Sequence, residues 1–378
     1  MKVKLGDVCD RGSSNLKQSD VINQNGQYPV YGAAGLLGNI DSYHQDKPYV
    51  AVVKDGAGIG RVTLHPGYSS VIGTLQYLLP KENVLPEYLY YVTKHMHLEK
   101  YYTGATIPHI YFKDYKNEKF NLDAIEKQQR IVDILKKTEN IIESRQQELQ
   151  KLDDLIKARF IELFGEPLSN QKGWQTMSIV EAAPIKSQRG DLGDEVWLLN
   201  LDAVEAQTGT VLFKHRVQSG KINASTVFFT TESVLYSKLR PYLNKVVMPN
   251  EDGVATSEMI PMYPLADRLN RAYLCYWLRS DAFVRHISEK VAGAKMPRVS
   301  MDYFRSLAIE LPPLELQGQF ADFVAQIDKS KLLSGCRFFH SWAPANLDNL
   351  NRVGVSRRKP KDLRGGRRQQ FRRQTGII

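Results

Sequence analysis

Two stretches of the chain share one skeleton of small residues and proline. The first, "TGATIPHIYFKDY", covers residues 103–115, and the second, "AGAKMPRVSMDYF", covers residues 292–304. Gly104, Ala105 and Pro108 of the first stretch have identical counterparts 189 positions later. Each stretch is followed by a segment with helical character. The sequence therefore predicts two structural repeats, each joined to a following helix by the same kind of junction.

The repeat extends beyond the junction in both directions. Downstream, the offset of 189 continues without a gap, whereas upstream it falls in steps toward 174. Such a pattern indicates two half-chains that differ by insertions in their globular parts but keep a junction of constant length. The matched pairs include Gln128 and Gln317 at 189, Tyr88 and Tyr273 at 185, Arg11-Gly12 and Arg189-Gly190 at 178, and Leu5 and Ile179 at 174.

A long helix follows the first junction. Residues 123–164 contain neither Gly nor Pro and are rich in Glu, Lys, Gln, Leu and Ile. Apolar residues recur every seven positions, which favours a coiled-coil spacer of about 60 Å over an ordinary long helix packed on its own domain. The stripe consists of Leu135, Ile142, Leu149, Ile156 and Leu163, with Leu152 widening it. A second helix of this type is predicted to begin after "LPP" at 311–313.

The 378 residues fit two domains, and short strand patterns alternate with helical ones in each half. We expect an α+β protein with two mixed α/β domains, separated by long coiled-coil helices and related by a pseudo-twofold repeat. The expected segments are a first domain at 1–121, a spacer helix at 122–165, a second domain at 166–310, the start of a second spacer at 311–333 and a tail at 334–378. Strands are expected at 49–53, 60–65, 74–79, 227–239 and 245–249, and helices at 86–100 and 269–287.

The net charge of +10 lies almost entirely in the tail, where 11 Lys/Arg face 2 Asp/Glu. Within the remaining chain, Lys214 to Lys245 holds six basic residues and one acidic residue, Glu232. That surplus suits a phosphate backbone but also an ordinary solvated surface. Three distant cysteines predict reduced thiols, and the lack of an apolar leader or span predicts a cytoplasmic protein without a membrane partner.

A glycine-rich stretch, "DGAGIGRV" at 55–62, is the nearest approach to a phosphate-binding loop. A strand-like segment follows it instead of a helix, so the stretch predicts a tight turn. The His and acidic residues show no metal-ligand spacing. We therefore predict no catalytic residue, no metal site and no cofactor site in this chain.

Taken together, five motifs resemble those of the DNA-specificity subunits of type I restriction-modification systems. They are "YPVYGAAGLLGNIDSY" at 28–43, the two Gly-Ala-x-x-Pro junctions, "LPPLELQ" at 311–317, "LIKARFIELFGEP" at 155–167 and "LYSKLRPYLNKV" at 235–246. The resemblance covers residues 1–333. It implies a non-enzymatic subunit whose two target recognition domains read the two halves of a split, asymmetric site in double-stranded DNA. Such subunits dock methyltransferase subunits on their helices, and endonuclease/translocase subunits join them for cleavage. S-adenosylmethionine, ATP and Mg²⁺ are then implied for the partners.

Polar and basic residues on loops are the candidates for contact with bases and phosphates. They are Lys54, Arg61, Thr106, His109, Lys238, Arg240, Tyr242, Asn244, Lys245, Lys295 and Arg298. The resemblance assigns partner docking to the helix residues Leu135, Ile142, Leu149, Leu152, Ile156 and Leu163. Two alternatives remain: a structural coiled-coil adaptor that binds DNA without sequence preference, and a nucleotide-using enzyme with a degenerate glycine-rich loop.

The tail departs from the family pattern. After about Leu333 the heptad gives way to an Arg-rich segment without periodicity, which predicts disorder. Its composition is typical of translation past a frameshift or a recombination junction, and a functional basic arm is the alternative. A complete second spacer helix is not expected.

Overall fold

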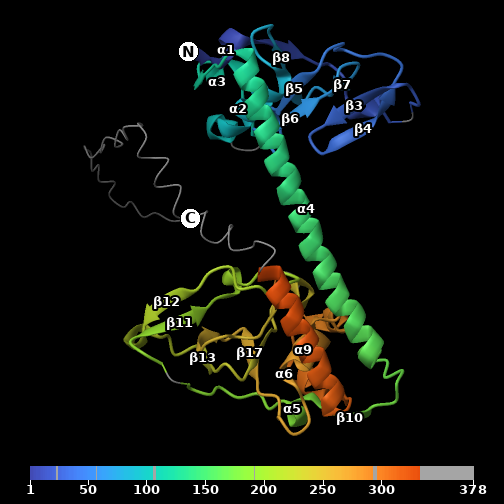
Figure 1. The fold of residues 1–378 in the computed structure, drawn as a ribbon, viewed down its shortest axis with the longest axis vertical. Coiled ribbons are helices and arrows are strands. Elements are labelled where there is room, and N and C mark those ends of the chain that lie inside the picture. The colour runs from blue at the N-terminus through green and yellow to red at the C-terminus, as the bar shows by residue number, and fades with distance from the viewer. Residues whose placement is uncertain (23, 57, 105–107, 191, 293–295, 333–378) are drawn as a thin grey trace, which may run out of the picture. The chain divides into compact units, whose positions relative to one another are not determined.

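The computed structural model describes residues 1–332 except 23, 57, 105–107, 191 and 293–295 (Figure 1). The chain forms two compact units, Met1–Gln146 and Gln147–Ile378. The boundary falls inside one 40-residue helix, α4 (Ile125–Phe164). The tail at 334–378 and the candidates Thr106 and Lys295 lie outside the described residues.

The first unit is built on a four-stranded sheet in the order β2-β8-β5-β6. A three-stranded sheet, β4-β3-β7, and the pair β1-β9 complete its β-structure. The helix α2 begins with Pro86, which suits a first helical turn because proline lacks the amide hydrogen that would be left unbonded there. The bounds are β1 (Lys2–Lys4), α1 (Leu5–Val8), β2 (Cys9–Ser13), β3 (Tyr28–Gly32), β4 (Gly35–Ile40), β5 (Tyr49–Val53), β6 (Val62–His65), β7 (Ser70–Val71), β8 (Leu75–Pro80), α2 (Pro86–His95), α3 (Phe112–Tyr115) and β9 (Lys119–Asn121), with short 3₁₀ turns at Gln18–Asp20 and Leu98–Tyr101.

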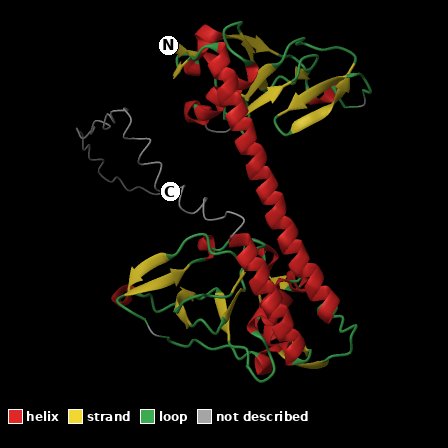
Figure 2. Cartoon of the chain, viewed as in Figure 1, coloured by secondary structure: helices red, strands yellow, loops and turns green. Residues whose placement is uncertain are grey.

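The second unit has a three-stranded sheet, β15-β14-β17, and a four-stranded sheet, β12-β11-β16-β13 (Figure 2). Two strand pairs, β10-β20 and β18-β19, accompany them. The bounds are β10 (Gln175–Ser178), α5 (Ile179–Ala182), β11 (Glu195–Leu199), β12 (His215–Gln218), β13 (Thr226–Phe229), β14 (Val234–Ser237), β15 (Val246–Val247), β16 (Gly253–Thr256), β17 (Met259–Met262), α6 (Arg271–Arg279), α7 (Asp281–Glu289), β18 (Val291–Ala292), β19 (Arg298–Val299), α8 (Met301–Ser306), β20 (Ala308–Leu311) and α9 (Leu314–Lys331), with 3₁₀ turns at Leu201–Ala203, Ser219–Lys221 and Pro241–Leu243.

Three strand pairings of the first unit recur in the second unit with equivalent registers. Strand β5 lies between β6 and β8 in the first unit as β14 lies between β15 and β17 in the second, all antiparallel. The terminal pairs β1-β9 and β10-β20 correspond in the same way. The predicted fold class, two repeated mixed α/β units with a long helix, is confirmed. The equivalent pairings are Val50 with Leu78 and Val234 with Met262, Val52 with Val62 and Tyr236 with Val246, and Val3 with Phe120 and Met177 with Ile309.

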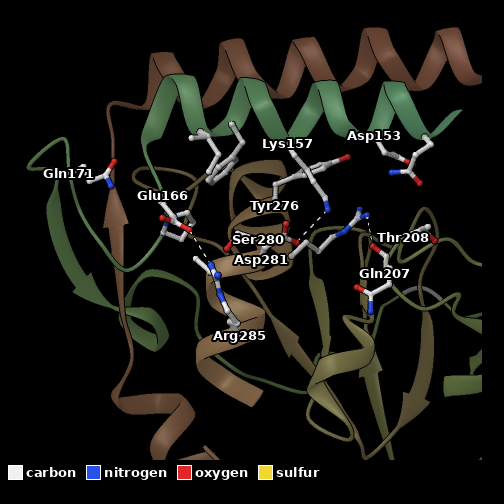
Figure 3. Close-up of a pocket in the computed structure, with 16 residues that line it drawn as sticks. Asp153, Lys157, Glu166, Gln171, Gln207, Thr208, Tyr276, Ser280, Asp281 and Arg285 are labelled. Carbon is white, nitrogen blue, oxygen red and sulfur yellow. Dashed lines mark hydrogen bonds and ion pairs between the residues drawn. The ribbon is translucent and has the colours of Figure 1, made fainter. Parts of the chain in front are cut away.

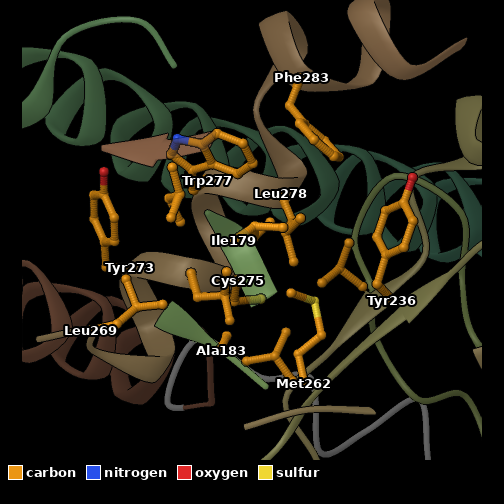
Figure 4. Close-up of a cluster of buried hydrophobic side chains, with 14 of the residues drawn as sticks. Ile179, Ala183, Tyr236, Met262, Leu269, Tyr273, Cys275, Trp277, Leu278 and Phe283 are labelled. Carbon is orange, nitrogen blue, oxygen red and sulfur yellow. The ribbon is translucent and has the colours of Figure 1, made fainter. Parts of the chain in front are cut away.

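Each unit has its own apolar core. In the second unit, α6 contributes Trp277 and Tyr273, and α7 contributes Phe283, to a cluster that includes Tyr236 and Met262 of the sheet (Figure 4). The indole of Trp277 donates a hydrogen bond of 2.6 Å to the buried Glu310 carboxylate. Buried aromatic side chains stabilise this core when their polar atoms are hydrogen-bonded. This packing holds α6 against the sheet.

The long helix α4 packs into a different core at each end. Val132 is buried with α2 in the first unit, and Phe160 and Phe164 pack on Tyr273 and Phe320 in the second. Helix α9 runs antiparallel to this second end of α4, because Phe320 meets Phe160 and Phe164 while Lys331 bonds to Asp153. Residue 333, the last residue of the expected start of the second spacer helix, lies outside the described residues.

The helix residues expected to dock a partner fall into two groups. Leu135, Ile142 and Leu149 are half-buried along the middle of α4. Leu152, Ile156 and Leu163 belong instead to the core of the second unit, and Ile156 is 0% exposed. Ile156 presents no surface to another subunit while this packing holds, whereas Leu152 and Leu163 are half-buried like the residues of the first group.

Three details differ from the sequence expectations. The stretch 227–239 is two strands, β13 and β14, because Thr230–Ser233 makes a turn between them. The helix expected at 269–287 is interrupted at Ser280, whose hydroxyl accepts a hydrogen bond from the Phe283 amide and so starts a new helix. The helix expected at 86–100 ends at His95.

The proposed match of Arg11-Gly12 with Arg189-Gly190 is wrong. Arg11 lies in β2 opposite Leu78, and the residue opposite the equivalent Met262 is Ile185. Ile185 lies at the offset of 174 that already relates Leu5 to Ile179. The two Arg-Gly dipeptides are therefore not at equivalent positions, because equivalence is set by the strand pairing.

Candidate nucleic-acid interface

Two loops that look unrelated in sequence are anchored by equivalent backbone hydrogen bonds. We call residues 54–61 the first loop and residues 238–245 the second loop. The Lys54 carbonyl accepts a hydrogen bond of 3.0 Å from the Ile110 amide, and the Lys238 carbonyl accepts one of 3.0 Å from Val299. Each loop follows a central strand. The first loop is held by the junction at 103–115, and the second loop by the junction at 292–304.

A second set of hydrogen bonds repeats across the same two loops. The Gly56 amide donates to the Pro108 carbonyl at 3.2 Å, and the Arg240 amide donates to the Pro297 carbonyl at 2.8 Å. The loops close alike, since Val53 donates to the Arg61 carbonyl at 2.9 Å and Ser237 to the Lys245 carbonyl at 3.1 Å. The shared junction prolines therefore anchor the loops through backbone groups.

The backbone of both loops enters the left-handed region at two matching positions, and Gly58 of the first loop, with φ of 87°, does so at a third. Gly56 and Gly60 have φ of 83° and 81°, and Arg240 and Asn244 have φ of 50° and 49°. Glycine adopts this conformation readily, whereas other residues do so at a cost of about 1–2 kcal/mol. The second loop thus places an arginine side chain where the first loop has none. The glycines of 55–62 form a tight turn followed by β6, as the sequence predicted.

The first loop borders a pocket of about 310 Å³ in the first unit. Its lining includes the cationic side chains of Arg11, Lys54 and Lys113 and one carboxylate, Asp55. Tyr111 is 48% exposed there and stacks on His109 with ring centroids 5.7 Å apart. Cations beside an exposed aromatic face are the combination that contacts phosphates and bases.

Within this pocket, His109 is already engaged. Its Nδ1 contacts the Asp55 carboxylate, and the two residues also form a backbone bridge. Lys113 lies over the Tyr111 ring at 5.2 Å. The Lys54 ammonium forms no hydrogen bond or ion pair with another described residue. Lys54 and Arg11 are therefore the cations of this surface best placed to meet an anion.

In the second unit, the exposed candidates among the described residues are Arg240, Tyr242 and Arg298, and Lys238 is half-buried. Tyr242 is 45% exposed. The Arg240 guanidinium has no hydrogen bond or ion pair within the described part of the chain. Arg298, by contrast, forms a bidentate ion pair with Glu258 at 3.0 and 3.2 Å. A free guanidinium on a rigid turn can form a bidentate contact with guanine.

Three other candidates have structural partners. Asn244 is 4% exposed and donates to the Arg279 carbonyl at 3.0 Å. The Lys245 ammonium donates to the Leu201 carbonyl at 2.6 Å, and burial lowers the pKa of this lysine. Arg61 donates to the Ala33 carbonyl at 2.9 Å. Their placement argues against a base contact from Asn244 and Lys245, whereas Arg61 is exposed and stays a candidate.

The basic surplus between Lys214 and Lys245 is smaller in the structure than in the sequence. Lys214 and Arg216 both form ion pairs of 2.7 Å with Glu251, which lies outside that stretch. Lysine and arginine together hold the pKa of the Glu251 carboxyl below its usual value despite its partial burial. Lys238 and Arg240 therefore carry most of the charge that a phosphate backbone could meet.

A larger pocket, of about 640 Å³, lies in the second unit between the end of α4 and the α6–α7 turn (Figure 3). Its charged side chains are paired across the opening: Lys157 with Asp281 and Arg285 with Glu166, each at 3.4 Å. The Arg279 guanidinium bonds to the Gln207 carbonyl at 3.2 Å. Because its cations are matched by acids, this pocket is less suited to a polyanion than the surface at the first loop.

Sequence reasoning missed Arg11, Tyr111 and Lys113. The pattern His109-Ile-Tyr111-Phe-Lys113 alternates aromatic and basic residues and could have indicated them. Arg11 could not have been found, because its proximity to Lys54 depends on strand pairing across the sheet. Among the described residues, no three His, Cys, Asp or Glu side chains are grouped to hold a metal ion. Over the same residues, no helix has the length and apolar character needed to cross a membrane.

The family model described as "Type I restriction modification DNA specificity domain" matches residues 1–154 and 172–335. The EcoDI type I restriction enzyme specificity subunit of Escherichia coli is 21% identical over 365 residues, covering 86% of this chain and 80% of that protein. The MjaVIII specificity subunit of Methanocaldococcus jannaschii is 23% identical over 318 residues, covering 74% and 72%. The crystal structure of a type I S subunit from M. genitalium has a TM-score of 0.56 at 15% identity, covering 93% of this chain and 94% of that one.

The two matched segments fall on the two repeated α/β units. The chain belongs to the type I restriction-modification DNA specificity family. The resemblance seen in the sequence motifs is thereby confirmed, and the chain is a type I specificity subunit whose relatives bear that name.

Proposed function

We propose that this chain reads a split, asymmetric sequence in double-stranded DNA, with one half-site for each unit. The observation that carries the proposal is the pair of equivalent loops. Their backbones are held by the same hydrogen bonds, while the side chains they present differ: Gly56 and Gly58 in one, Arg240 and Tyr242 in the other. Loops with the same backbone anchors and different side chains would place different DNA-contacting groups in comparable positions of the two units.

DNA contact in the first unit would come from Arg11, Lys54, Lys113 and Tyr111 around the 310 Å³ pocket. In the second unit it would come from Lys238, Arg240 and Tyr242. Lysine side chains would meet phosphates, and the Arg240 guanidinium would meet a base edge. Arg61, His109 and Arg298 would adjoin these surfaces. Thr106 and Lys295, outside the described residues, remain part of the proposal because they belong to the junctions.

We further propose that the chain is not an enzyme and serves as the recognition component of a larger complex. Methyltransferase subunits would dock on the middle of α4, where Leu135, Ile142 and Leu149 are half-buried and Ile134 and Ile141 are 64% and 62% exposed. Endonuclease/translocase subunits would join for cleavage. S-adenosylmethionine would be used by the methyltransferase subunits, and ATP and Mg²⁺ by the endonuclease subunits.

The test is methylation of a DNA library with randomised bases and gap lengths. The chain with its cognate methyltransferase subunit and S-adenosylmethionine should modify adenine in two short sequence blocks at a fixed separation. The chain alone should give no turnover. Methylation by the isolated chain would contradict the non-enzymatic role. Uniform, salt-sensitive binding to every duplex would instead favour the alternative of a coiled-coil adaptor without sequence preference.

A further inference from the structure

Two buried glutamines occupy equivalent places near the starts of α4 and α9. Gln128 and Gln317 are both 0% exposed, and they are related by the junction offset of 189. Glutamine is mostly exposed in proteins, and a buried carboxamide needs partners for both its oxygen and its nitrogen. The sequence identity alone assigned no role to either residue.

The carboxamide of Gln128 makes three hydrogen bonds to backbone groups. Its oxygen accepts from the Leu85 amide at 2.9 Å, and its nitrogen donates to the carbonyls of Asn83 at 3.0 Å and Asp123 at 2.8 Å. Leu85 is the residue directly before α2. One side chain therefore ties the beginning of α4 to the beginning of α2.

Gln317 makes the same three bonds in the second unit. Its oxygen accepts from the Asn270 amide at 2.7 Å, and its nitrogen donates to the carbonyls of Arg268 at 3.1 Å and Pro312 at 2.7 Å. Asn270 directly precedes α6 and caps it. All six partners are backbone atoms, so the arrangement persists although the partner residues differ between the units.

A tyrosine reinforces each glutamine. The Tyr88 hydroxyl of α2 donates to the Asn121 carbonyl at 2.9 Å, and the Tyr273 hydroxyl of α6 donates to the Glu310 carbonyl at 3.0 Å. Asn121 and Glu310 lie on the strands β9 and β20 that precede the long helices. Each domain helix is thus bonded to the start of its spacer helix and to the strand before it.

We propose that Gln128 and Gln317 are positioning residues that set the angle between each recognition unit and the helix that leaves it. We call the two sets of three hydrogen bonds the glutamine latches. A carboxamide suits this task because it supplies one acceptor and two donors in a single plane. The consequence for DNA, that each latch fixes where its half-site is read, rests on the proposed function.

The direct test measures the angle without DNA, by electron spin resonance distances between two spin labels within one unit. Labels at Lys47→Cys and Glu143→Cys report on the first unit, and labels at Lys221→Cys and Gln326→Cys report on the second, in a Cys336→Ser background. All four labelled positions are exposed, and the cysteines Cys9 and Cys275 are buried. Gln128→Met should broaden or shift the distance distribution of the first unit and leave the second unchanged, with the reverse for Gln317→Met.

Matched controls lie next to each latch. Gln129 and Gln319 are exposed, and Gln129 bonds within its own helix to Asp133 at 2.8 Å. Gln129→Met and Gln319→Met should leave both distributions unchanged. An unchanged distribution in Gln128→Met and Gln317→Met, or an equal broadening in the controls, would overturn the proposal.

A second pair of variants keeps the test decisive if the methionine variants unfold. Glutamate at position 128 or 317 has the same length, and its protonated form can donate to one carbonyl and accept from the amide. Desolvation and the facing carbonyls would raise its pKa above the ordinary value of about 4.3. Gln128→Glu and Gln317→Glu should therefore show narrow distributions at low pH that broaden as the pH rises. Distributions that do not change with pH would contradict the latch.

The functional readout is the gap-length library with the complete methyltransferase complex. Each methionine variant should accept neighbouring gap lengths that the native complex rejects, while the bases preferred in both halves stay the same. A changed base preference with an unchanged gap would contradict positioning. If the native complex showed no sequence preference, the proposed function would fail, and the label distances would still decide the latch.

Discussion

The first and second loops show what the two units share and what they do not. Both are anchored by the same backbone bonds to Pro108 and Pro297, and both pass through the left-handed region at matching positions. The first does so with glycines and the second with Arg240 and Asn244. The comparison teaches that the repeat conserves the path of the backbone, which leaves the side chains free to differ between half-sites.

Glycines of the first loop differ in the space around them, and this gives the largest expected effect. A Cβ at Gly60 would lie 2.5 Å from the Glu99 amide nitrogen, whereas a Cβ at Gly56 would meet nothing within 4 Å. Both substitutions to alanine incur about 1–2 kcal/mol of left-handed strain. We expect Gly60→Ala to lower the free energy of unfolding of the first unit by about 3 kcal/mol or more, because a backbone clash adds to the strain.

Chemical denaturation of the two alanine variants checks this difference, and Gly56→Ala serves as the matched control. The position equivalent to Gly56 is Arg240, which already carries a side chain there. Equal destabilisation of the two variants would show that Gly60 does not pack against Glu99 as described here.

Acid should affect the first unit through His65, which the second unit lacks. Burial lowers the pKa of His65 to about 4 from an ordinary value of about 6.5. A folded pKa below the unfolded one means that the unfolded state binds more protons between these values. The stability is therefore complete above about pH 6.5 and falls toward pH 4, by about 3 kcal/mol.

Unfolding measurements across pH 4 to 7 on the native chain and on His65→Gln check this assignment. The slopes of the free energy of unfolding against pH should differ between the two proteins by the contribution of one titrating group. The same slope in His65→Gln as in the native chain would show that groups other than His65 cause the loss of stability at low pH. The second unit, whose equivalent position is Pro249, should show no change from this substitution.

Arg240 should give the smallest of these effects and the most selective one. Arg240→Ala should weaken binding by the complex to its native site by about 1–3 kcal/mol and relax base preference at one position of one half-site. Arg305→Ala, which removes an exposed arginine paired only within its helix to Asp302, is the control. Equal weakening across unrelated sequences would mean that Arg240 contacts a phosphate.

Much of the fold could be predicted because the junction keeps its length. Gly104, Pro108 and their counterparts located both units and the starts of both helices. The correspondence between the two loops could not be predicted, because Gly56 and Arg240 both lie in the left-handed region but have no side-chain chemistry in common. The break at Ser280 was also missed, because the helical pattern continues through a residue whose hydroxyl caps the next helix.

The candidate site was harder to predict than the fold. Sequence position showed which residues lie on loops, but it could not show that Asn244 is buried or that Arg298 is bonded to Glu258. Both facts depend on residues far away in the chain. Gln128 and Gln317 were visible as an identity, and their role was hidden because every partner is a backbone atom.

The most direct test of the central claim is an exchange of one recognition unit. Residues 169–310 would be replaced by the corresponding part of another specificity subunit, with both latch glutamines kept, and the methylated sites in cellular DNA would be sequenced. The account predicts that one half of the recognised sequence changes while the other half and the gap stay the same. A change in both halves together, or in neither, would contradict the claim that each unit recognises its own half-site independently of the other.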